Sequence, residues 1–243
     1  MKLVLLADGH VGEEVTDFLL ETYADDIELV VTKEINSIYN TVKKSEIPVR
    51  VFDSEDSIVE KLNEGVDLGV MAWWPKILKK PLLNYPRLGF VNTHPSLLPY
   101  NRGKHYNFWA LVEQVPFGVT LHCVDQGIDT GNIIAQSKLS YDWCDTGQTL
   151  YKKAQNAMVE LFRKTYPLMR TGQFESTPQS KTIGSFHHSS ELDLASRIEL
   201  DQLYRASDLL NLIRARTFEG YPGCWFEIDG VRYEISVNIR KVK

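Results

Sequence analysis

The chain has 243 residues, of which 43% are hydrophobic and 11% aromatic, so it can bury the core of one domain with a smaller appendage. Its net charge of −5 argues against a nucleic-acid-binding protein, which usually carries a basic face. The three cysteines are far apart and form no CxxC pair, which excludes a disulfide framework and a zinc knuckle. No apolar window approaches the roughly 20 residues of a membrane helix. From the cysteines we expect a reducing cytoplasm, and from the charge a small-molecule substrate.

Short β-prone runs alternate with amphipathic segments in the first part of the chain. The runs cover residues 2–7, 27–32, 48–52, 68–74 and 88–94. This alternation predicts an α/β domain with a mostly parallel sheet. Ligands bind beyond the carboxyl ends of the strands in such sheets, so the end of the run at 88–94 is a candidate site.

Residues 8–12, Asp-Gly-His-Val-Gly, follow the first strand and invite comparison with a nucleotide-binding loop. They lack the third glycine of GxGxxG, and Glu13 and Glu14 follow, where carboxylates repel a phosphate. We interpret the segment as an ordinary strand-to-helix turn.

Asn92 and His94 are one residue apart at the end of an apolar run, so a strand there directs both side chains to the same face. Asp129 lies in a turn bounded by glycines between two further strand-like runs, and we expect the three side chains to converge. Donors from Asn92 and protonated His94 would stabilise an oxyanion, and Asp129 would accept a proton, directly or through water. The set suits acyl transfer to an amine.

Taken singly, these residues have simpler explanations: Asn92 and Asp129 cap turns, and His94 is a buried, hydrogen-bonded histidine. A metal hydrolase is a competing interpretation, because His94, His122, Asp129 and the pair His187 and His188 could be ligands. No HExxH or similar close spacing occurs, so we predict no metal. We expect His122 to lie in a polar core and the histidine pair to lie in a solvated loop.

Two helical segments follow the candidate site in the chain. One covers residues 104–114 directly after the Leu-Leu-Pro loop, and the other lies within residues 146–172. A polar stretch over residues 172–181 comes next. We therefore predict a domain over residues 1–172 and a C-terminal region over residues 173–243.

The C-terminal region has the pattern of a helix and a β-hairpin. Leu200, Leu203, Leu210 and Ile213 repeat at helical spacing within residues 199–215, and an Asp229-Gly230 hairpin signal lies between two β-prone runs. A lone hairpin is marginal in water, so this region must pack on the first domain or on another subunit. We expect a homodimer built on it, a fold back onto its own chain being the alternative.

The residues around the candidate site resemble those of the folate-dependent formyltransferases. The pattern is Asn-x-His-x-Ser-Leu-Leu-Pro followed by an Asp-x-Gly turn, and the likeness covers residues 1–170 approximately. The matching residues are Asn92, His94, Ser96, Leu97, Leu98, Pro99, Arg102, Gly103, Gly118, Thr120, His122, Asp129, Thr130, Gly131 and Gln136. The resemblance implies a Rossmann-like formyltransferase domain in which Asn92, His94 and Asp129 are catalytic.

The same resemblance implies N10-formyltetrahydrofolate as the formyl donor. In that family the pterin enters a slot lined by the segment at 71–78 and by the loop before the catalytic aspartate. The cofactor-binding residues expected here are Lys76, Ile77, Leu78, Leu82, Phe90, Val124, Asp125, Gln126, Gly127 and Ile128. From hydrophobicity alone, the apolar members of this set would be core residues.

Residues 213–230 resemble the tail of the sugar N-formyltransferases, which act on nucleotide-linked amino sugars. The resemblance implies a dTDP-linked 3- or 4-amino-dideoxyhexose as acceptor, used for surface polysaccharide such as O-antigen. The expected acceptor-binding residues are Phe218, Tyr221 and Trp225 for stacking on the base, Lys76, Arg102 or His105 for the pyrophosphate, and His105, Tyr106 and Asn107 for the sugar. Those aromatic residues could equally be tail packing.

Three alternatives to this acceptor remain. Methionyl-tRNA would call for a basic face and a larger C-terminal domain, and glycinamide ribonucleotide would call for a different loop at residues 8–12. A non-catalytic folate or nucleotide-sugar binding module would keep the scaffold without turnover. The sequence does not distinguish a C-3 from a C-4 amine, gluco from galacto configuration, or thymine from uracil.

Overall fold

The computed structural model describes residues 1–63 and 65–242. The chain forms two compact units whose segments interleave in sequence. Unit 1 consists of Met1–His94, Thr120–Ser137 and Gln155–Gln179; unit 2 consists of Pro95–Val119, Lys138–Ala154 and the described residues from Ser180 onward. The predicted division between residues 172 and 173 stays a prediction.

A seven-stranded sheet with the order β3-β2-β1-β4-β5-β7-β8 lies mostly in unit 1. Its strands are β1 (Leu3–Ala7), β2 (Ile27–Thr32), β3 (Val49–Val51), β4 (Leu68–Ala72), β5 (Phe90–His94), β7 (Phe117–Cys123) and β8 (Ile133–Leu139). The pairs among β1 to β5 are parallel, and the β5–β7 pair is antiparallel. The predicted α/β fold with a mostly parallel sheet is confirmed.

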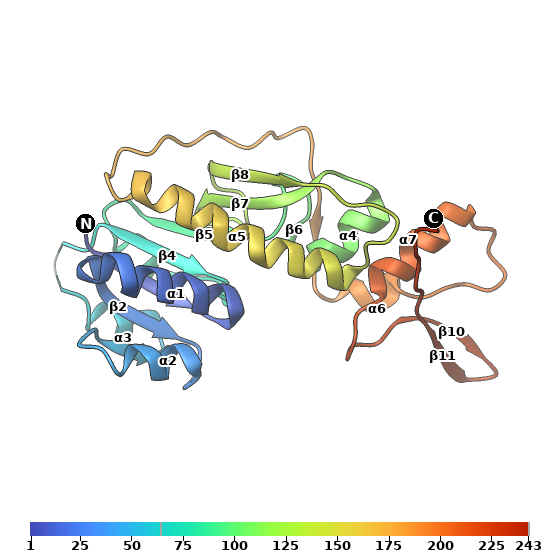
Figure 1. Cartoon of the computed structure of the whole chain (residues 1–243), viewed down its shortest axis with the longest axis horizontal. Helices are drawn as coiled ribbons and strands as arrows, with labels where there is room; N and C mark the ends of the chain where they lie inside the picture. Colours follow the sequence, from blue (N-terminus) through green and yellow to red (C-terminus); the bar gives the residue numbers. More distant parts are fainter. Residues whose placement is uncertain (64, 243) are drawn as a thin grey trace. The chain divides into compact units, whose positions relative to one another are not determined.

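Strands buried on both faces form the centre of this sheet. Every residue of β1 and of β4 is buried, as expected for a parallel sheet with helices over it. The helical elements of unit 1 are α1 (Gly9–Tyr23), η1 (Ala24–Asp26), α2 (Ser37–Val42), α3 (Glu55–Val59), η2 (Leu82–Asn84) and the later part of α5 (Gly147–Met169). Figure 1 shows α1 over β1, β2 and β4. Val11, Val15 and Leu19 of this helix are buried.

A cluster of buried side chains in unit 1 joins residues of β1, β2, β4 and β5 to the segments around them. It includes Val4, Leu6, Leu29, Val31, Ile58, Leu62, Val66, Met71, Trp74, Leu78, Leu82, Leu83 and Phe90. Val124, which begins the loop toward Asp129, packs against this cluster. The loop therefore starts from a fixed apolar base.

Unit 2 contains short strands and three further helices. They are β6 (Arg102–Gly103), α4 (Tyr106–Glu113), β9 (Phe186–His187), α6 (Glu191–Ala195), α7 (Ala206–Arg216), β10 (Cys224–Ile228) and β11 (Val231–Ile235). Helices α4 and α7 pack against each other. Arg214 of α7 is 2% exposed and donates to the backbone carbonyls of Asp142 and Asp145, which ties α7 to the chain before α5.

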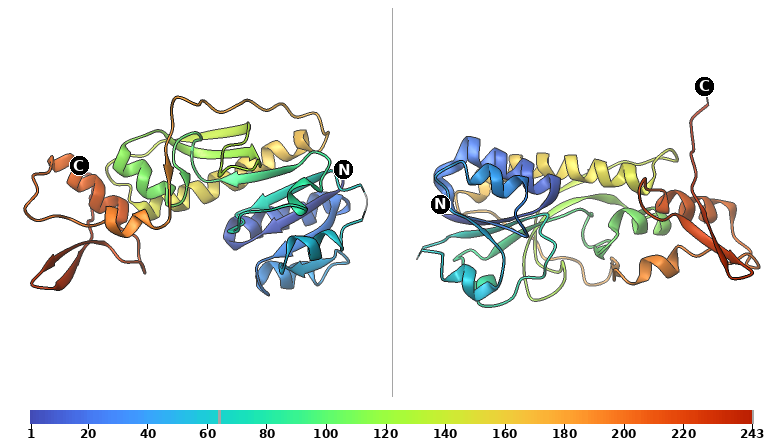
Figure 2. Two further views of the ribbon diagram at one scale, coloured as in Figure 1. Left: turned by 180° about the vertical axis from the view of Figure 1, so that it is seen from behind. Right: turned by 90° about the horizontal axis from the view of Figure 1, so that it is seen from below.

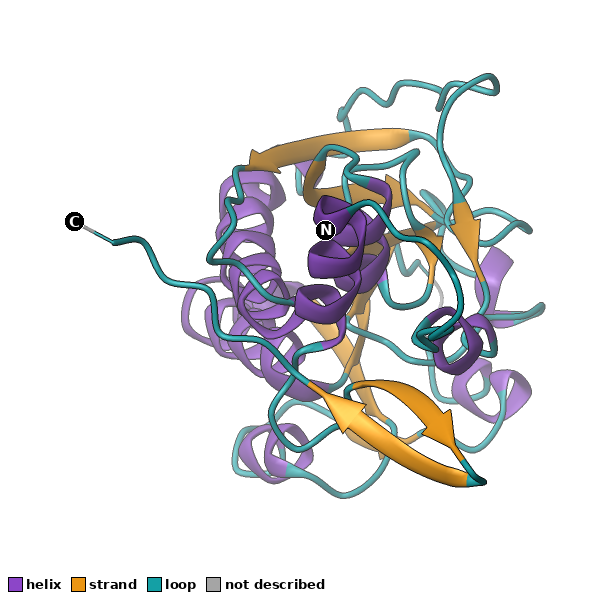
Figure 3. Cartoon of the chain, turned by 90° about the vertical axis from the view of Figure 1, so that its right-hand side faces the viewer, coloured by secondary structure: helices purple, strands orange, loops and turns teal. Residues whose placement is uncertain are grey.

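The predicted hairpin at Asp229-Gly230 is confirmed. Strands β10 and β11 pair antiparallel in a sheet of their own, and both turn residues have positive φ, 51° and 76°. Figures 2 and 3 show the hairpin as a separate ribbon, after which the chain continues without regular secondary structure.

The predicted tail helix over residues 199–215 was wrong at its start. Helix α7 begins at Ala206 because Arg205 is extended, and the preceding residues form a turn in which Gln202 N donates to Glu199 O. Leu200 and Leu203 therefore lie outside the helix and are exposed. The two leucines are spaced as on one face of a helix, but neither packs against a core.

No helix among the described residues is both long enough and apolar enough to span a membrane.

Candidate active site

Strand β5 presents Asn92 and His94 on one face at its carboxyl end, as the spacing predicted. Thr93 points the other way, where its hydroxyl accepts from Trp73 N at 2.9 Å and donates to Met71 O at 3.2 Å. These bonds fix the end of β5 to the end of β4. The orientation of Asn92 and His94 therefore follows from the sheet itself.

Strand β7 completes the same face through its antiparallel register. His122 lies opposite Asn92, and Thr120 lies opposite His94. The His122 side chain is 2% exposed, and its Nδ1 is 2.8 Å from the Cys123 carbonyl oxygen. Because a carbonyl oxygen can only accept, Nδ1 carries the proton, and Nε2 accepts from the Asn92 amide nitrogen at 3.3 Å.

Asp129 lies next to both histidines. Its Oδ2 is 3.4 Å from His94 Nδ1 and its Oδ1 is 3.6 Å from His122 Nε2. The exposed fractions of the side chains are 13% for Asp129 and 5% for His94, so both groups are largely withdrawn from water. The structure thus brings the three predicted catalytic residues together in unit 1, and an amide, an imidazole and a carboxylate face one spot.

The loop that carries Asp129 is fixed by its own short-range bonds. Asp125 Oδ1 accepts from Gly127 N at 3.0 Å and from the Thr130 hydroxyl at 2.7 Å. A Cβ on Gly131 would lie 1.8 Å from the Cys123 carbonyl oxygen, so only glycine fits there. Gly131 is therefore required by close backbone approach, whereas a Cβ on Gly127 would meet the Thr130 side chain.

His122 is a site residue whose role the sequence interpretation missed. The β-prone run around it predicted a polar core position, which its burial matches. Only the β5–β7 register places its ring beside Asn92 and Asp129, and that register leaves no local signal in the sequence.

His94, His122 and Asp129 could together hold a metal ion, since one ligand atom from each lies within 4.8 Å of the others. In the observed arrangement, however, the Asn92 amide donates toward His122 Nε2, the nitrogen that a metal would need. A donor aimed at that lone pair competes with a cation. The local hydrogen bonding therefore favours acid–base chemistry over metal binding.

The histidine pair at 187 and 188 does not behave as one solvated loop, so that expectation was wrong for His187. His187 is 8% exposed, stacks on Trp109 with centroids 3.8 Å apart, and contacts Glu113 and Glu191 at 2.9 and 3.2 Å. His188 is exposed. Two carboxylates and an indole hold the His187 ring, which explains its burial.

The residues expected to bind the folate differ in exposure. Leu78, Leu82 and Phe90 are at most 6% exposed and belong to the apolar cluster of unit 1. Ile77 is 69% exposed, and Asp125, Gln126, Gly127 and Ile128 form an exposed part of the loop. Lys76 is also exposed, with its Nζ 4.5 Å from the centre of the Phe52 ring. An apolar surface beside exposed backbone groups suits a flat heterocycle, and contact of these residues with a folate stays a prediction.

The expected acceptor-binding residues other than Lys76 belong to unit 2, and two of them are core residues there. Tyr106 is 7% exposed and stacks with Phe117 and Tyr151, and burial raises its pKa well above the usual value. Asn107 is buried and donates to Gly147 O at 2.8 Å. Their contact with a sugar stays a prediction.

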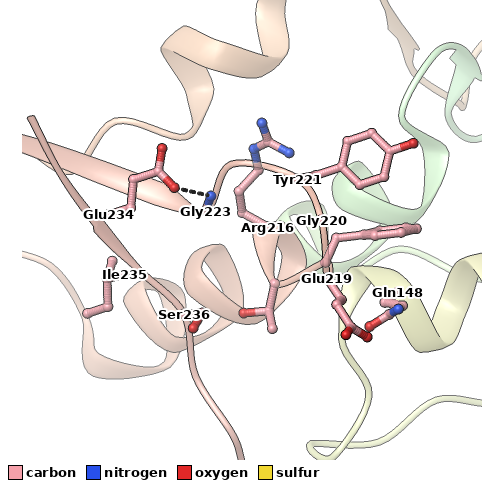
Figure 4. Close-up of a pocket in the computed structure, with 11 residues that line it drawn as sticks. Gln148, Arg216, Glu219, Gly220, Tyr221, Gly223, Glu234, Ile235 and Ser236 are labelled. Carbon is pink, nitrogen blue, oxygen red and sulfur yellow. Dashed lines mark hydrogen bonds between the residues drawn. The ribbon is translucent and has the colours of Figure 1, made fainter.

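Phe218 and Tyr221 line a cavity of about 400 Å³ in unit 2, together with Arg216, Glu219 and Glu234 (Figure 4). Burial lowers the pKa of the Arg216 guanidinium.

Trp225 is not among the residues that line this cavity, because it packs elsewhere in unit 2. It donates to Asp193 O at 3.0 Å and lies against the guanidinium groups of Arg197 and Arg232. Arg102 and His105 are half-buried in unit 2, Arg102 in β6 and His105 before α4.

Comparison with known proteins identifies the family. Residues 1–165 match the sequence model of the formyl transferase family, and residues 191–241 match that of the N-formyltransferase dimerization C-terminal domain. The chain therefore belongs to the formyl transferase family, as the motifs predicted.

Curated relatives agree with this assignment. The chain is 32% identical to the bifunctional polymyxin resistance protein ArnA of Wigglesworthia glossinidia brevipalpis over 160 residues, or 65% of this chain. It is 30% identical over 181 residues to a methionyl-tRNA formyltransferase of Syntrophus aciditrophicus, which covers 73% of this chain. The matches span 24% and 55% of those proteins, less than two thirds of their length.

Solved structures share the fold over 80% to 99% of the chain. A 4-N formyltransferase from Francisella tularensis superimposes with a TM-score of 0.83 over 99% of this chain and 98% of its own, at 22% identity. An N-formyltransferase from Helicobacter canadensis superimposes with a TM-score of 0.73 over 95% of this chain and 85% of its own, at 21% identity. For the formyltransferase PseJ from Anoxybacillus kamchatkensis the TM-score is 0.60 over 80% of this chain and 89% of its own, at 27% identity.

Proposed function

We propose that the chain is a sugar N-formyltransferase that moves a formyl group from N10-formyltetrahydrofolate to the amino group of a dTDP-linked 3- or 4-amino-dideoxyhexose. The observation that carries the proposal is the meeting of Asn92, His94 and Asp129 on one face of the formyl transferase unit. We further propose that the enzyme is a cytoplasmic homodimer whose product is used to build surface polysaccharide such as O-antigen.

The choice of acceptor is supported by the ligands of the similar structures. The Helicobacter canadensis structure contains folinic acid and dTDP-3-aminofucose, and the Anoxybacillus structure contains a UDP-linked formamido sugar and tetrahydrofolate. Likeness to the Francisella protein extends over nearly the whole of both chains. Methionyl-tRNA is the second candidate acceptor, because two curated relatives are named methionyl-tRNA formyltransferases.

The folate supplies a formyl group on N10 that an amine can attack. An Asn92 N–H and the protonated His94 ring would donate to the formyl oxygen as it gains negative charge. Asp129, the carboxylate beside His94, would accept the proton that leaves the attacking nitrogen, directly or through one water. A proton passed on to N10 as the bond between N10 and the formyl carbon breaks would release tetrahydrofolate. The partial burial of this group strengthens each of these interactions.

The first test is formyl transfer to a panel of dTDP- and UDP-aminodeoxyhexoses, with methionyl-tRNA and glycinamide ribonucleotide included. Folate absorbance and the mass of the acceptor report the reaction. We expect one aminodeoxyhexose to gain one formyl group. Transfer only to methionyl-tRNA or glycinamide ribonucleotide would replace the acceptor, and folate binding without any transfer would favour a non-catalytic module.

Variants test the roles of the three residues. Asn92→Ala, His94→Ala and Asp129→Ala should each lower turnover by more than about a hundredfold while the thermal midpoint stays near that of the wild type. Glu46→Gln, at an exposed carboxylate of unit 1, is the matched control and should keep full activity. A His94 variant with near-normal turnover would refute the mechanism.

A further inference from the structure

A segment far from the active-site residues in sequence passes along the loop that carries Asp129. Thr177 and Ile133 exchange two backbone hydrogen bonds of 2.8 Å, and the Asn132 amide donates to the Ser176 hydroxyl at 3.3 Å. Figure 1 shows the chain after α5 running alongside β8. Residues 176–179, which we term the crossing segment, are therefore fixed next to the Asp129 loop within unit 1.

Gln179 uses both hydrogens of its side-chain amide on this loop. Its Nε2 donates to the backbone carbonyl of Asp129 at 2.8 Å and to that of Gly131 at 2.8 Å. The two carbonyls lie on either side of Thr130, so one side chain holds the turn from outside. A primary amide is suited to this task because it has two donors at a fixed angle.

The backbone held in this way has an unfavourable conformation. Asp129 has a φ of 54°, in the left-handed region that L-residues other than glycine rarely adopt. Such a conformation is strained and persists only where its surroundings impose it. Rotation back toward negative φ would carry the Asp129 side chain away from His94 and His122.

We propose that Gln179 is a positioning residue for the Asp129 carboxylate. Its two hydrogen bonds keep the left-handed turn and thereby the distances of 3.4 and 3.6 Å from the Asp129 carboxylate to His94 Nδ1 and His122 Nε2. The kinetic part of this inference rests on the proposed formyl transfer. A displacement of about 1 Å at a reacting group can cost a hundredfold in rate, so the effect should be measurable.

The test replaces the amide without changing the length of the side chain. Gln179→Met removes both donors and should lower kcat about 10- to 100-fold, with the KM for both substrates within about threefold. Gln173→Met makes the same change at an exposed position of the same polypeptide stretch and should leave kcat unaltered. Gln179→Lys, which keeps N–H donors on a chain of similar length, should restore part of kcat.

A second readout does not depend on activity. In Gln179→Met, the ¹⁵N and ¹H resonances of the His94 ring should shift as its contact with Asp129 lengthens, while those of His187, held by Glu113 and Glu191, should not. Unchanged His94 resonances together with wild-type kcat would overturn the proposal. If wild-type protein transfers no formyl group, the proposed function fails, yet the resonances still decide the role of Gln179. If Gln179→Met does not fold, the comparison of Gln179→Lys with Gln179→Glu replaces it, and equal His94 spectra in those two variants would refute the role.

Discussion

The turn around Asp129 depends on residues that take no part in the chemistry. The missing side chain of Gly131 lets its Cα approach the Cys123 carbonyl, and Asp125 bonds to the far side of the turn. Spacing alone indicated a turn bounded by glycines with a carboxylate in it. It could not show that the turn backbone is held by Gln179, because that contact joins residues 50 positions apart.

Gly131→Ala should destabilise the fold. The added Cβ would lie 1.8 Å from a backbone oxygen, which cannot move aside as a flexible side chain would. We expect a loss of about 3 kcal/mol in the free energy of unfolding, the upper end of overpacking effects, measured by urea denaturation. Lys138→Ala, at an exposed position of β8, is the control and should change stability by less than about 0.5 kcal/mol.

His105 should make stability depend on pH. Burial lowers its pKa, and the positive charges of Arg216 and Lys104 lower it further, against a smaller opposite effect of a hydrogen bond with the Ser189 backbone. The unfolded chain then binds the proton first as pH falls, so stability is full above the unfolded pKa of about 6.5 and decreases below it.

Urea unfolding at pH 8 and at pH 5.5 tests this prediction. In His105→Asn the loss of stability between the two pH values should be smaller than in the wild type, and asparagine tolerates the left-handed backbone of this position, where φ is 60°. An equal loss in both proteins would assign the pH dependence to other groups.

Helix α5 is anchored to the start of β2 by one buried carboxylate. Asp26 accepts from the Tyr166 hydroxyl at 2.9 Å and from Arg170 Nε and Nη2 at 2.5 and 3.0 Å. Burial and the nearby Asp26 carboxylate raise the pKa of Tyr166. The periodicity of α5 predicted the helix but not this anchor, because the partners are more than a hundred residues apart in the chain.

Removing the Asp26 carboxylate should cost more than removing the Tyr166 hydroxyl. Asp26→Ala leaves a buried hydroxyl without its acceptor. We therefore expect it to lower the free energy of unfolding by about 2–3 kcal/mol, against about 1 kcal/mol for Tyr166→Phe. The double variant should lose less than the sum of the two, because the orphaned hydroxyl is gone. Strict additivity in urea unfolding would show that the hydrogen bond contributes no coupling.

The hairpin β10–β11 has one apolar and one polar face. Phe226 pairs with Tyr233 and Ile228 with Val231 on one face, where Val231 and Tyr233 are 51% and 47% exposed; Glu227 and Arg232 are on the other. This division follows from the alternation of side chains along each strand. An exposed apolar hairpin face in a region that matches a dimerization domain supports the proposed homodimer.

Sedimentation velocity tests the dimer. Tyr233→Glu places a charge on the apolar face and should shift the protein from dimer to monomer at micromolar concentration, since an unpaired buried charge is costly. Glu227→Lys, on the polar face of the same hairpin, should leave the association unchanged. A dimer that survives Tyr233→Glu, or a wild-type monomer, would contradict the assignment of this face.

The sequence by itself determined the features that depend on local order. These are the parallel sheet from the alternation of strands and helices, the hairpin at Asp229-Gly230, and the shared face of Asn92 and His94, since residues two apart on a strand point the same way. The tertiary structure decided what depends on pairing between distant segments. The β5–β7 register brings His122 to Asn92, the crossing segment brings Gln179 to Asp129, and Leu200 and Leu203 fall outside a helix that their spacing predicted. Local physics sets the direction of a side chain along its own element, whereas its neighbours across space follow from long-range packing and register, which no single stretch of sequence encodes.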